Sequence, residues 1–93
     1  MIRRFADKHS AAIFAGLFVT GLPSDIQMRA RARLKALNAA TELGDLRAPP
    51  GNRLESLRGD RKGQHSIRIN DQYRICFRWE TEYAFEVEIA DYH

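Results

Sequence analysis

The sequence predicts an α+β fold in which two N-terminal helices pack on one face of a four- to five-stranded, mostly antiparallel sheet. Apolar residues of the first half recur at helical intervals, whereas from Leu54 onward they occupy alternate positions. The segment 48–52, which contains two prolines and a glycine, separates the two halves. The chain has 93 residues, enough for one modest core and too few for two, so residues 1–93 are expected to form a single domain.

The first helix is expected to begin after Asp7, which is a favoured N-cap residue. It runs toward Leu17, and Ala11, Phe14 and Phe18 follow one another at helical spacing.

The second helix is expected after Gly21 and Pro23, because these residues interrupt the first one. Segment 24–27, Ser-Asp-Ile-Gln, has the form of a capping box. Four apolar residues then line one side at intervals of four, four and three: Ile26, Ala30, Leu34 and Leu37. Four basic residues fall mostly off this stripe and are expected to form a solvated helix face: Arg29, Arg31, Arg33 and Lys35.

The second half predicts three consecutive antiparallel strands, joined by turns at 70–72 and 80–82, with residues 2–5 as a candidate additional strand. Pairing the apolar sets places Ile67 opposite Ile75 and Trp79 opposite Tyr83. The predicted core positions of the strands are Ile67, Ile69, Tyr73, Ile75, Phe77, Trp79, Tyr83, Phe85, Val87 and Ile89.

The polar face of this sheet is expected to carry a row of charges. The same register places Arg68 opposite Arg74, and Arg74 opposite Glu88. Directly opposed like charges are unfavourable by about 0.2–1 kcal/mol unless a counter-charge is supplied. The row is therefore either a surface ladder of ion pairs or a place where arginines meet a phosphate.

Positive charge is concentrated in the middle of the chain. Residues 47–79 contain eight basic and three acidic side chains, and seven of the eight are arginines, whose planar donors suit phosphate. Arg58, Arg61 and Lys62 lie in the loop that leads to the polar face. This pattern indicates a polyanionic partner, with a solvated basic surface as the alternative.

The last three residues, Asp91, Tyr92 and His93, combine groups that orient, stack and transfer protons near neutral pH. Beside arginines they suit RNA cleavage, which needs a base, an acid and positive charge at the phosphate. The alternative is a frayed polar terminus. His9 and His65 are interpreted as an exposed helix residue and a strand residue, so no set of ligands has metal spacing and a metal-free mechanism is expected.

Cellular location and redox chemistry are constrained by two further features. The longest apolar run, 11–18, is shorter than the ~20 residues of a membrane span, and no signal-peptide cleavage site follows it, so a cytoplasmic protein is expected. Cys76 is the only cysteine and is interpreted as a small, half-buried hydrophobic residue, not a catalytic thiol.

Several motifs together resemble the HigB family of plasmid-maintenance killer proteins, which belong to the RelE-type, ribosome-dependent mRNA interferases. The similarity extends over essentially the whole chain. It is carried by residues 1–5 (MIRRF), 40–44 (ATELG), 54–63 (LESLRGDRKG), 66–70 (SIRIN), 73–78 (YRICFR) and 91–93 (DYH).

The resemblance implies a RelE-like microbial ribonuclease fold and a toxin that cleaves mRNA in the ribosomal A site without a cofactor. The 2′-hydroxyl would attack the adjacent phosphate, leaving a 2′,3′-cyclic phosphate and a 5′-hydroxyl. The implied partners are the 70S ribosome, mRNA and a HigA-type helix-turn-helix antitoxin. Operator DNA would be bound only through the antitoxin, since the chain shows no helix-turn-helix signal of its own.

The resemblance also implies roles for individual residues. Arg74 would stabilise the phosphate, Asp91, Tyr92 and His93 would form the terminal catalytic group, and Arg58 would contact the RNA backbone. From the residues themselves we expect Arg68 to help Arg74, and Tyr92 and His93 to supply acid–base function and base stacking, oriented by Asp91. Further basic contacts to RNA are expected from Arg61, Lys62 and Arg68.

Glu55 departs from the pattern, because some relatives carry a histidine at this place. Either Glu55 or His93 is then the candidate general base. Two alternatives to an active nuclease follow: a non-catalytic module that binds RNA or the ribosome, and a catalytically weakened toxin that mainly forms a complex with its antitoxin.

Overall fold

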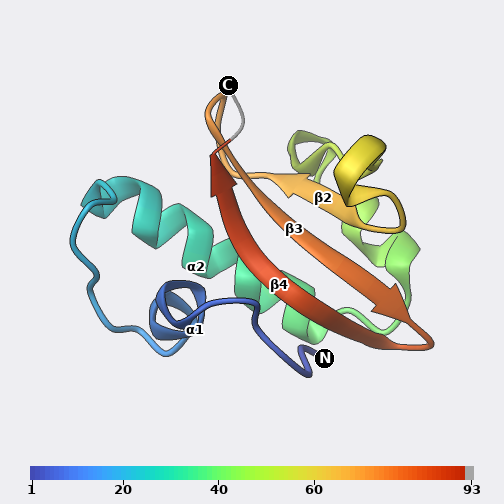
Figure 1. Cartoon of the computed structure of the whole chain (residues 1–93), viewed down its shortest axis with the longest axis horizontal. Helices are drawn as coiled ribbons and strands as arrows, with labels where there is room; N and C mark the ends of the chain where they lie inside the picture. Colours follow the sequence, from blue (N-terminus) through green and yellow to red (C-terminus); the bar gives the residue numbers. More distant parts are fainter. Residues whose placement is uncertain (92–93) are drawn as a thin grey trace.

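The described residues form a layer of helices packed on a four-stranded antiparallel sheet, as predicted (Figure 1). The computed structural model describes residues 1–91. The strands lie in chain order, β1-β2-β3-β4. The elements are α1 (Lys8–Phe14), α2 (Ser24–Ala39), β1 (Glu55–Ser56), β2 (His65–Arg68), β3 (Tyr73–Glu80) and β4 (Tyr83–Asp91), with short 3-10 helices η1 (Leu43–Arg47), η2 (Pro50–Asn52) and η3 (Gly59–Arg61).

Helix α1 begins where the sequence predicts and ends earlier. The Asp7 carboxylate accepts a hydrogen bond from the backbone N–H of Ser10 at 2.7 Å, which confirms the N-cap. The helix ends at Phe14 because Gly16 has a left-handed backbone, with φ of 89°. Phe18 therefore leaves the helical stripe and is 70% exposed, so its predicted place on that stripe is wrong.

Helix α2 buries its predicted apolar stripe. Ile26 retains 6% of its exposure, and Ala30, Leu34 and Leu37 retain none. Each fully buried leucine contributes about 1.5–3 kcal/mol of hydrophobic free energy. No helix in the part of the chain that the structure describes has the length and apolarity to cross a membrane.

The predicted capping box at the start of α2 is wrong. No side chain caps this helix, and Gln27 is buried instead. Its amide accepts a hydrogen bond from the Val19 N–H at 3.0 Å and donates to the carbonyls of Val19 and Leu22 at 2.7 and 2.6 Å. The loop between the helices folds back onto α2, so the Gln27 side chain satisfies loop backbone groups and not its own helix terminus.

The basic side of α2 is only partly solvated. Arg29 and Lys35 are exposed, as predicted. Arg31 and Arg33 are half-buried and donate hydrogen bonds to the carbonyls of Phe14 and Arg68 at 3.4 and 3.2 Å. These two arginines therefore link α2 to neighbouring elements.

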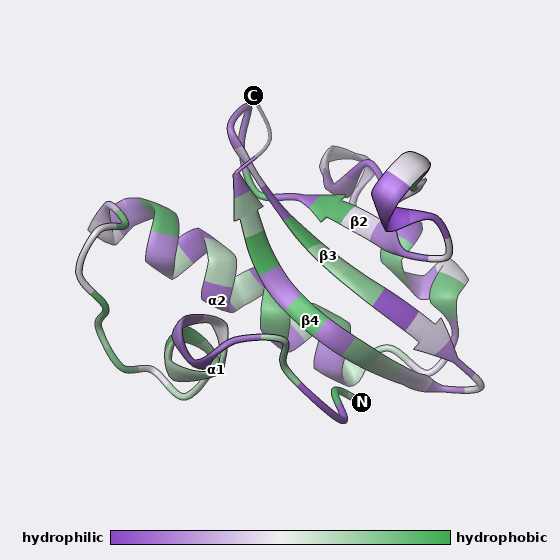
Figure 2. Ribbon diagram, viewed as in Figure 1, coloured by the Kyte–Doolittle hydropathy of each residue, from purple (hydrophilic) through white to green (hydrophobic). Residues whose placement is uncertain are grey.

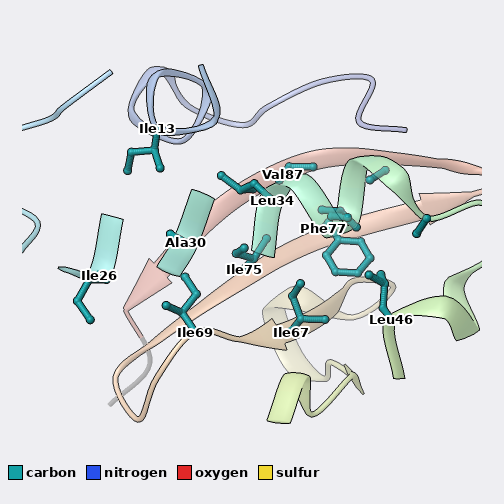
Figure 3. Packing of buried hydrophobic residues seen from close by; sticks show 13 residues of the cluster. Ile13, Ile26, Ala30, Leu34, Leu46, Ile67, Ile69, Ile75, Phe77 and Val87 are labelled. Carbon is teal, nitrogen blue, oxygen red and sulfur yellow. The ribbon is translucent and has the colours of Figure 1, made fainter. Parts of the chain in front are cut away.

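The core lies between the helices and one face of the sheet (Figure 3). Hydrophobic and hydrophilic residues alternate along β4, which is consistent with one buried face (Figure 2). The fully buried residues of the core are Leu34, Leu37, Ile67, Ile75, Phe77, Ala84 and Val87 beside Ala30, with Ile13, Leu46 and Ile69 almost as deeply buried.

The N-terminal segment pairs with the outer edge of β4. It runs parallel to this strand through isolated bridges of Ile2 with Ala84 and of Phe5 with Val87. The N–H of Arg3 donates to the Ala84 carbonyl at 2.8 Å. The candidate additional strand is therefore present as two parallel bridges that protect the sheet edge.

The register between β3 and β4 differs from the prediction. A two-residue turn places Glu80 opposite Tyr83 and Trp79 opposite Ala84, and Thr81 within it has φ of 60°. The sequence predicts Trp79 opposite Tyr83, whereas in the structure Ala84 faces Trp79. Ala84 is therefore the residue that is buried in the core at this point of β4.

A β-bulge then shifts the register again. The irregularity falls between Cys76 and Arg78 of β3, and the facing Glu86 of β4 has φ of 53°. Beyond it Arg74 lies opposite Ala90, and the predicted pairing of Arg74 with Glu88 is wrong.

The two register shifts change which residues of β4 face the core. Phe85 lies opposite Arg78 on the polar face, and not in the core as predicted. Tyr83 is half-buried, with the Arg3 guanidinium 4.2 Å from the centre of its ring.

We predict that Gln27→Ala destabilises the domain by about 1–3 kcal/mol, because partly buried backbone groups of the loop lose their hydrogen-bond partner. Urea denaturation followed by circular dichroism measures the change. Met28→Ala is the control: its side chain is 75% exposed, so the free energy of unfolding is expected to change by less than about 0.5 kcal/mol. Equal effects of the two substitutions would contradict the assigned role of Gln27.

Candidate functional site

The sheet face opposite the helices carries the predicted arginines. Arg68 lies opposite Arg74 in the β2–β3 pairing, as predicted. Each has its own carboxylate: Arg68 pairs with Asp71, and Arg74 lies 3.8 Å from Glu55. Separate counter-charges relieve the repulsion that two directly opposed arginines would cause.

Arg74 is held firmly by neutral groups as well. Its Nε donates to the Ser66 hydroxyl at 2.7 Å, and its Nη2 donates to the Arg53 carbonyl at 2.7 Å. The side chain retains 11% of its exposure, and Ser66 is fully buried. Within residues 1–91, no group accepts a hydrogen bond from Nη1. The guanidinium is thus oriented and keeps donor capacity for a phosphate oxygen.

The loop that contains η3 approaches the same face from one side. Arg61 forms a 2.6 Å ion pair with Glu88 of β4, and both side chains are about two-thirds covered, with 31% and 27% exposed. Gly63 passes so close to Arg78 that a Cβ on the glycine would lie 2.9 Å from the guanidinium. Arg58 and Lys62 are exposed on this loop.

Arg78 is a basic residue of this face that the sequence analysis did not select. The available signal was its position on β3, four residues after Arg74 and therefore on the same side of the strand. The structure places it opposite Phe85 and beside Gly63.

Asp91 lies on the other side of the sheet. It pairs with Tyr73, and its carboxylate accepts a hydrogen bond from Gln72 at 3.1 Å. It lines a hollow of about 230 Å³ together with residues of α1 and of the loop that follows. The structure therefore does not group its side chain with Arg74. Tyr92 and His93 lie outside the described residues, so their roles stay predictions.

A second feature that the sequence analysis did not find is a pocket at the outer edge of β1. Its volume is about 360 Å³. It is lined by Leu43, Arg47, Pro50, Arg53, Leu54, Glu55, Ser56 and His65. No sequence motif marks it, because its walls come from η1, η2, β1 and β2, which only the fold brings together.

His65 forms part of the wall of this pocket. Its ring lies 5.9 Å from the ring of Phe77, and its Nδ1 lies 3.4 Å from the Ser56 hydroxyl. Partial burial lowers the pKa of His65 below its ordinary value, so the neutral imidazole predominates at physiological pH. A neutral imidazole offers one donor and one acceptor.

The remaining titratable and thiol groups add no second centre. Cys76 is fully buried under the polar face, deeper than the half-buried position predicted. Among residues 1–91, no three of the histidine, cysteine and acidic side chains are placed so that they could hold a metal ion.

Comparisons with known proteins identify related chains. The protein named Toxin HigB-1 from Vibrio cholerae serotype O1 is 50% identical over 58 residues, which span 62% of this chain and 61% of that protein. Endoribonuclease HigB from Proteus vulgaris is 33% identical over 93 residues, the full length of both. A solved structure of a YoeB-YefM complex from Staphylococcus aureus contains a chain with the same fold, at a TM-score of 0.62, 13% identity and coverage of 100% of this chain and 98% of that one.

A family model extends this result to nearly the whole sequence. The model describes the RelE-like toxin of the type II toxin-antitoxin system HigB, and it matches residues 3–93. The matched region includes the strands, the arginines of the polar face and the loop of η3. The chain therefore belongs to the HigB-like family of RelE-like toxins of type II toxin-antitoxin systems.

Proposed function

We propose that this toxin is an endoribonuclease that cuts mRNA in the A site of the ribosome. The observation that carries the proposal is the Arg74 guanidinium, fixed by Ser66 and by the Arg53 carbonyl on a face rich in arginine. The full-length similarity to a protein named Endoribonuclease HigB supports the activity.

The proposed chemistry is an internal transfer at phosphorus. The 2′-oxygen attacks the adjacent phosphate, the bond to the 5′-oxygen breaks, and a 2′,3′-cyclic phosphate and a 5′-hydroxyl result. Negative charge builds on the non-bridging oxygens, where Arg74 Nη1 donates a hydrogen bond. The proposed mechanism uses no metal ion and no cofactor, with Arg74 supplying the positive charge at the phosphate.

Proton transfer requires a base for the 2′-hydroxyl and an acid for the leaving oxygen. Glu55 lies 3.8 Å from Arg74 and its side chain is 58% exposed, so it can reach a bound RNA. Glu55 and His93 are the two candidates for the base. Tyr92 and His93 are proposed to donate the proton and to stack on a base, with Asp91 orienting them.

The basic loop is proposed to hold the RNA backbone on either side of the cut. Arg58 and Lys62 are exposed and available to phosphates, while Arg61 is positioned by Glu88 and Arg68 by Asp71. Such contacts position RNA without reading its sequence.

The partners follow from the family and from this activity. As a member of a type II system the toxin acts with an antitoxin, and we propose that this antitoxin is a HigA-type helix-turn-helix protein. The 70S ribosome and mRNA are the proposed targets, in the cytoplasm. Operator DNA is proposed to be contacted only by the antitoxin.

A weakened toxin that mainly binds its antitoxin is the second candidate. The observation that favours it is the low exposure of Arg74, whose side chain is 11% exposed and already hydrogen-bonded to Ser66 and Arg53. A non-catalytic module that binds RNA or the ribosome is the third possibility from the same face.

We predict that Arg74→Ala lowers cleavage of ribosome-bound mRNA by about 10²–10³-fold, the usual cost of losing one group that stabilises transition-state charge. Mapping the new 5′ ends of mRNA after induction measures the cuts. Arg29→Ala removes an exposed arginine from the helical layer and is expected to cleave normally. Unchanged cuts in Arg74→Ala would overturn the assignment, and the absence of cuts in the unmodified toxin would favour a binding module or a weakened toxin.

We predict that Glu55→Gln lowers the rate by about 10²–10⁴-fold if this carboxylate is the general base. The measurement is single-turnover cleavage on programmed ribosomes across a range of pH. Glu82→Gln, in the exposed β3–β4 turn, is the matched control. If the Glu55→Gln toxin cleaves at the full rate, Glu55 is not the general base and His93 becomes the candidate for it.

A further inference from the structure

The pocket at the edge of β1 adjoins the polar face through two shared residues. Arg53 and Glu55 line the pocket and also contact Arg74: Arg53 through its carbonyl at 2.7 Å and Glu55 through its carboxylate at 3.8 Å. By the strand register, Ser56 and His65 lie on the opposite face of the sheet from Glu55 and Ser66. A nucleotide next to a phosphate at Arg74 would therefore reach the pocket around the edge of β1.

The pocket has the composition of a site for a flat, polar-edged group. Leu43, Pro50 and Leu54 supply apolar surface, whereas Ser56 and His65 supply hydrogen-bonding groups. Its volume of about 360 Å³ falls in the ~300–1,000 Å³ range of small-molecule pockets. A nucleobase combines an apolar face with a polar edge, and proteins that recognise single-stranded RNA stack such bases on aromatic side chains, histidine among them, or on arginine, and hydrogen-bond their edges.

The charges around the pocket suit the rest of a nucleotide. Arg47 and Arg53 are exposed at its wall, where they can meet a backbone phosphate. The imidazole of His65 contacts the Phe77 ring, with 5.9 Å between ring centres, and its Nδ1 lies 3.4 Å from the Ser56 hydroxyl, so a polar edge is present at the pocket wall. This arrangement favours a base over a featureless apolar group.

We propose that the pocket between β1 and the η1–η2 segment binds the base of the RNA nucleotide next to the cut phosphate. The inference rests on the proposed function, since it places that phosphate at Arg74. The pocket then adds base contacts to a site whose other contacts are to the backbone. It makes Ser56 and His65 residues that influence which nucleotide is accepted.

The test compares mRNAs that carry either a normal nucleotide or an abasic ribose on one side of the cut, bound to purified ribosomes. For the unmodified toxin, removal of the base that enters the pocket is expected to lower kcat/KM by about tenfold, the scale of losing one stacked base. The abasic ribose on the other side of the cut is expected to have a smaller effect.

A variant that fills the pocket supplies the decisive comparison. Ser56→Leu places an aliphatic side chain at an exposed position of β1 that lines the pocket. It is expected to lower kcat/KM on the normal mRNA by about tenfold and to show no further loss with the abasic mRNA. Glu80→Leu, an equally exposed strand position outside the pocket, is the control and is expected to behave like the unmodified toxin.

Equal sensitivity of the unmodified toxin and Ser56→Leu to the abasic mRNA would overturn the inference, as would no sensitivity in either. The proposed nuclease function would stand in those cases if Arg74→Ala still lowered cleavage by about 10²–10³-fold. A second measurement uses an oligonucleotide with 2′-deoxyribose at the cut. It lacks the attacking 2′-hydroxyl and is not cleaved, so its equilibrium binding is measured independently of catalysis. Loss of binding with the abasic oligonucleotide in the unmodified toxin, but not in Ser56→Leu, is the supporting result, and equal binding of both oligonucleotides is the contrary one.

Discussion

The arrangement of the polar face depends on the hydrogen bonds of one arginine. The guanidinium of Arg74 on β3 joins the hydroxyl of Ser66 on β2 to the carbonyl of Arg53, just before β1. Arg53 has a left-handed backbone with φ of 46°, a conformation that costs about 1–3 kcal/mol and persists where surrounding contacts hold it. These hydrogen bonds therefore orient the guanidinium and position the segment that leads into β1, which forms one wall of the neighbouring pocket.

The β-bulge at Glu86 decides which charges meet on this face. Without it, the register set by the β3–β4 turn would place Ile89 opposite Arg74 and Glu88 opposite the buried Ile75. With it, Ala90 lies opposite Arg74 and Glu88 lies opposite Cys76, where it pairs with Arg61 at 2.6 Å. The bulge thus places the carboxylate of Glu88 on the polar face, where it holds the basic loop against the sheet.

The sequence predicts the structure accurately where burial alone decides it. The stripe of α2, the alternation of β2 and β3 and the facing of Arg68 and Arg74 were all predicted, because apolar residues must share a face to be buried. The predictions for Gln27, Phe18 and the β3–β4 register are wrong. These depend on how a loop folds back, on the left-handed residue Gly16 and on a bulge, none of which has a hydrophobic period.

For the candidate site, the chain by itself determined the residue types: the arginines, Glu55 and the acidic and aromatic residues at the end, together with a motif pattern that indicated the family correctly. Only the tertiary structure decided which of them meet. It brought Arg74, Ser66, Arg53 and Glu55 together, paired Arg61 with Glu88, turned Asp91 toward the helices and formed the pocket around His65. The physical reason is that contacts between strands depend on register, which turn geometry and bulges set together with the packing of the buried face, and the apolar period alone specifies neither the turn nor the bulge.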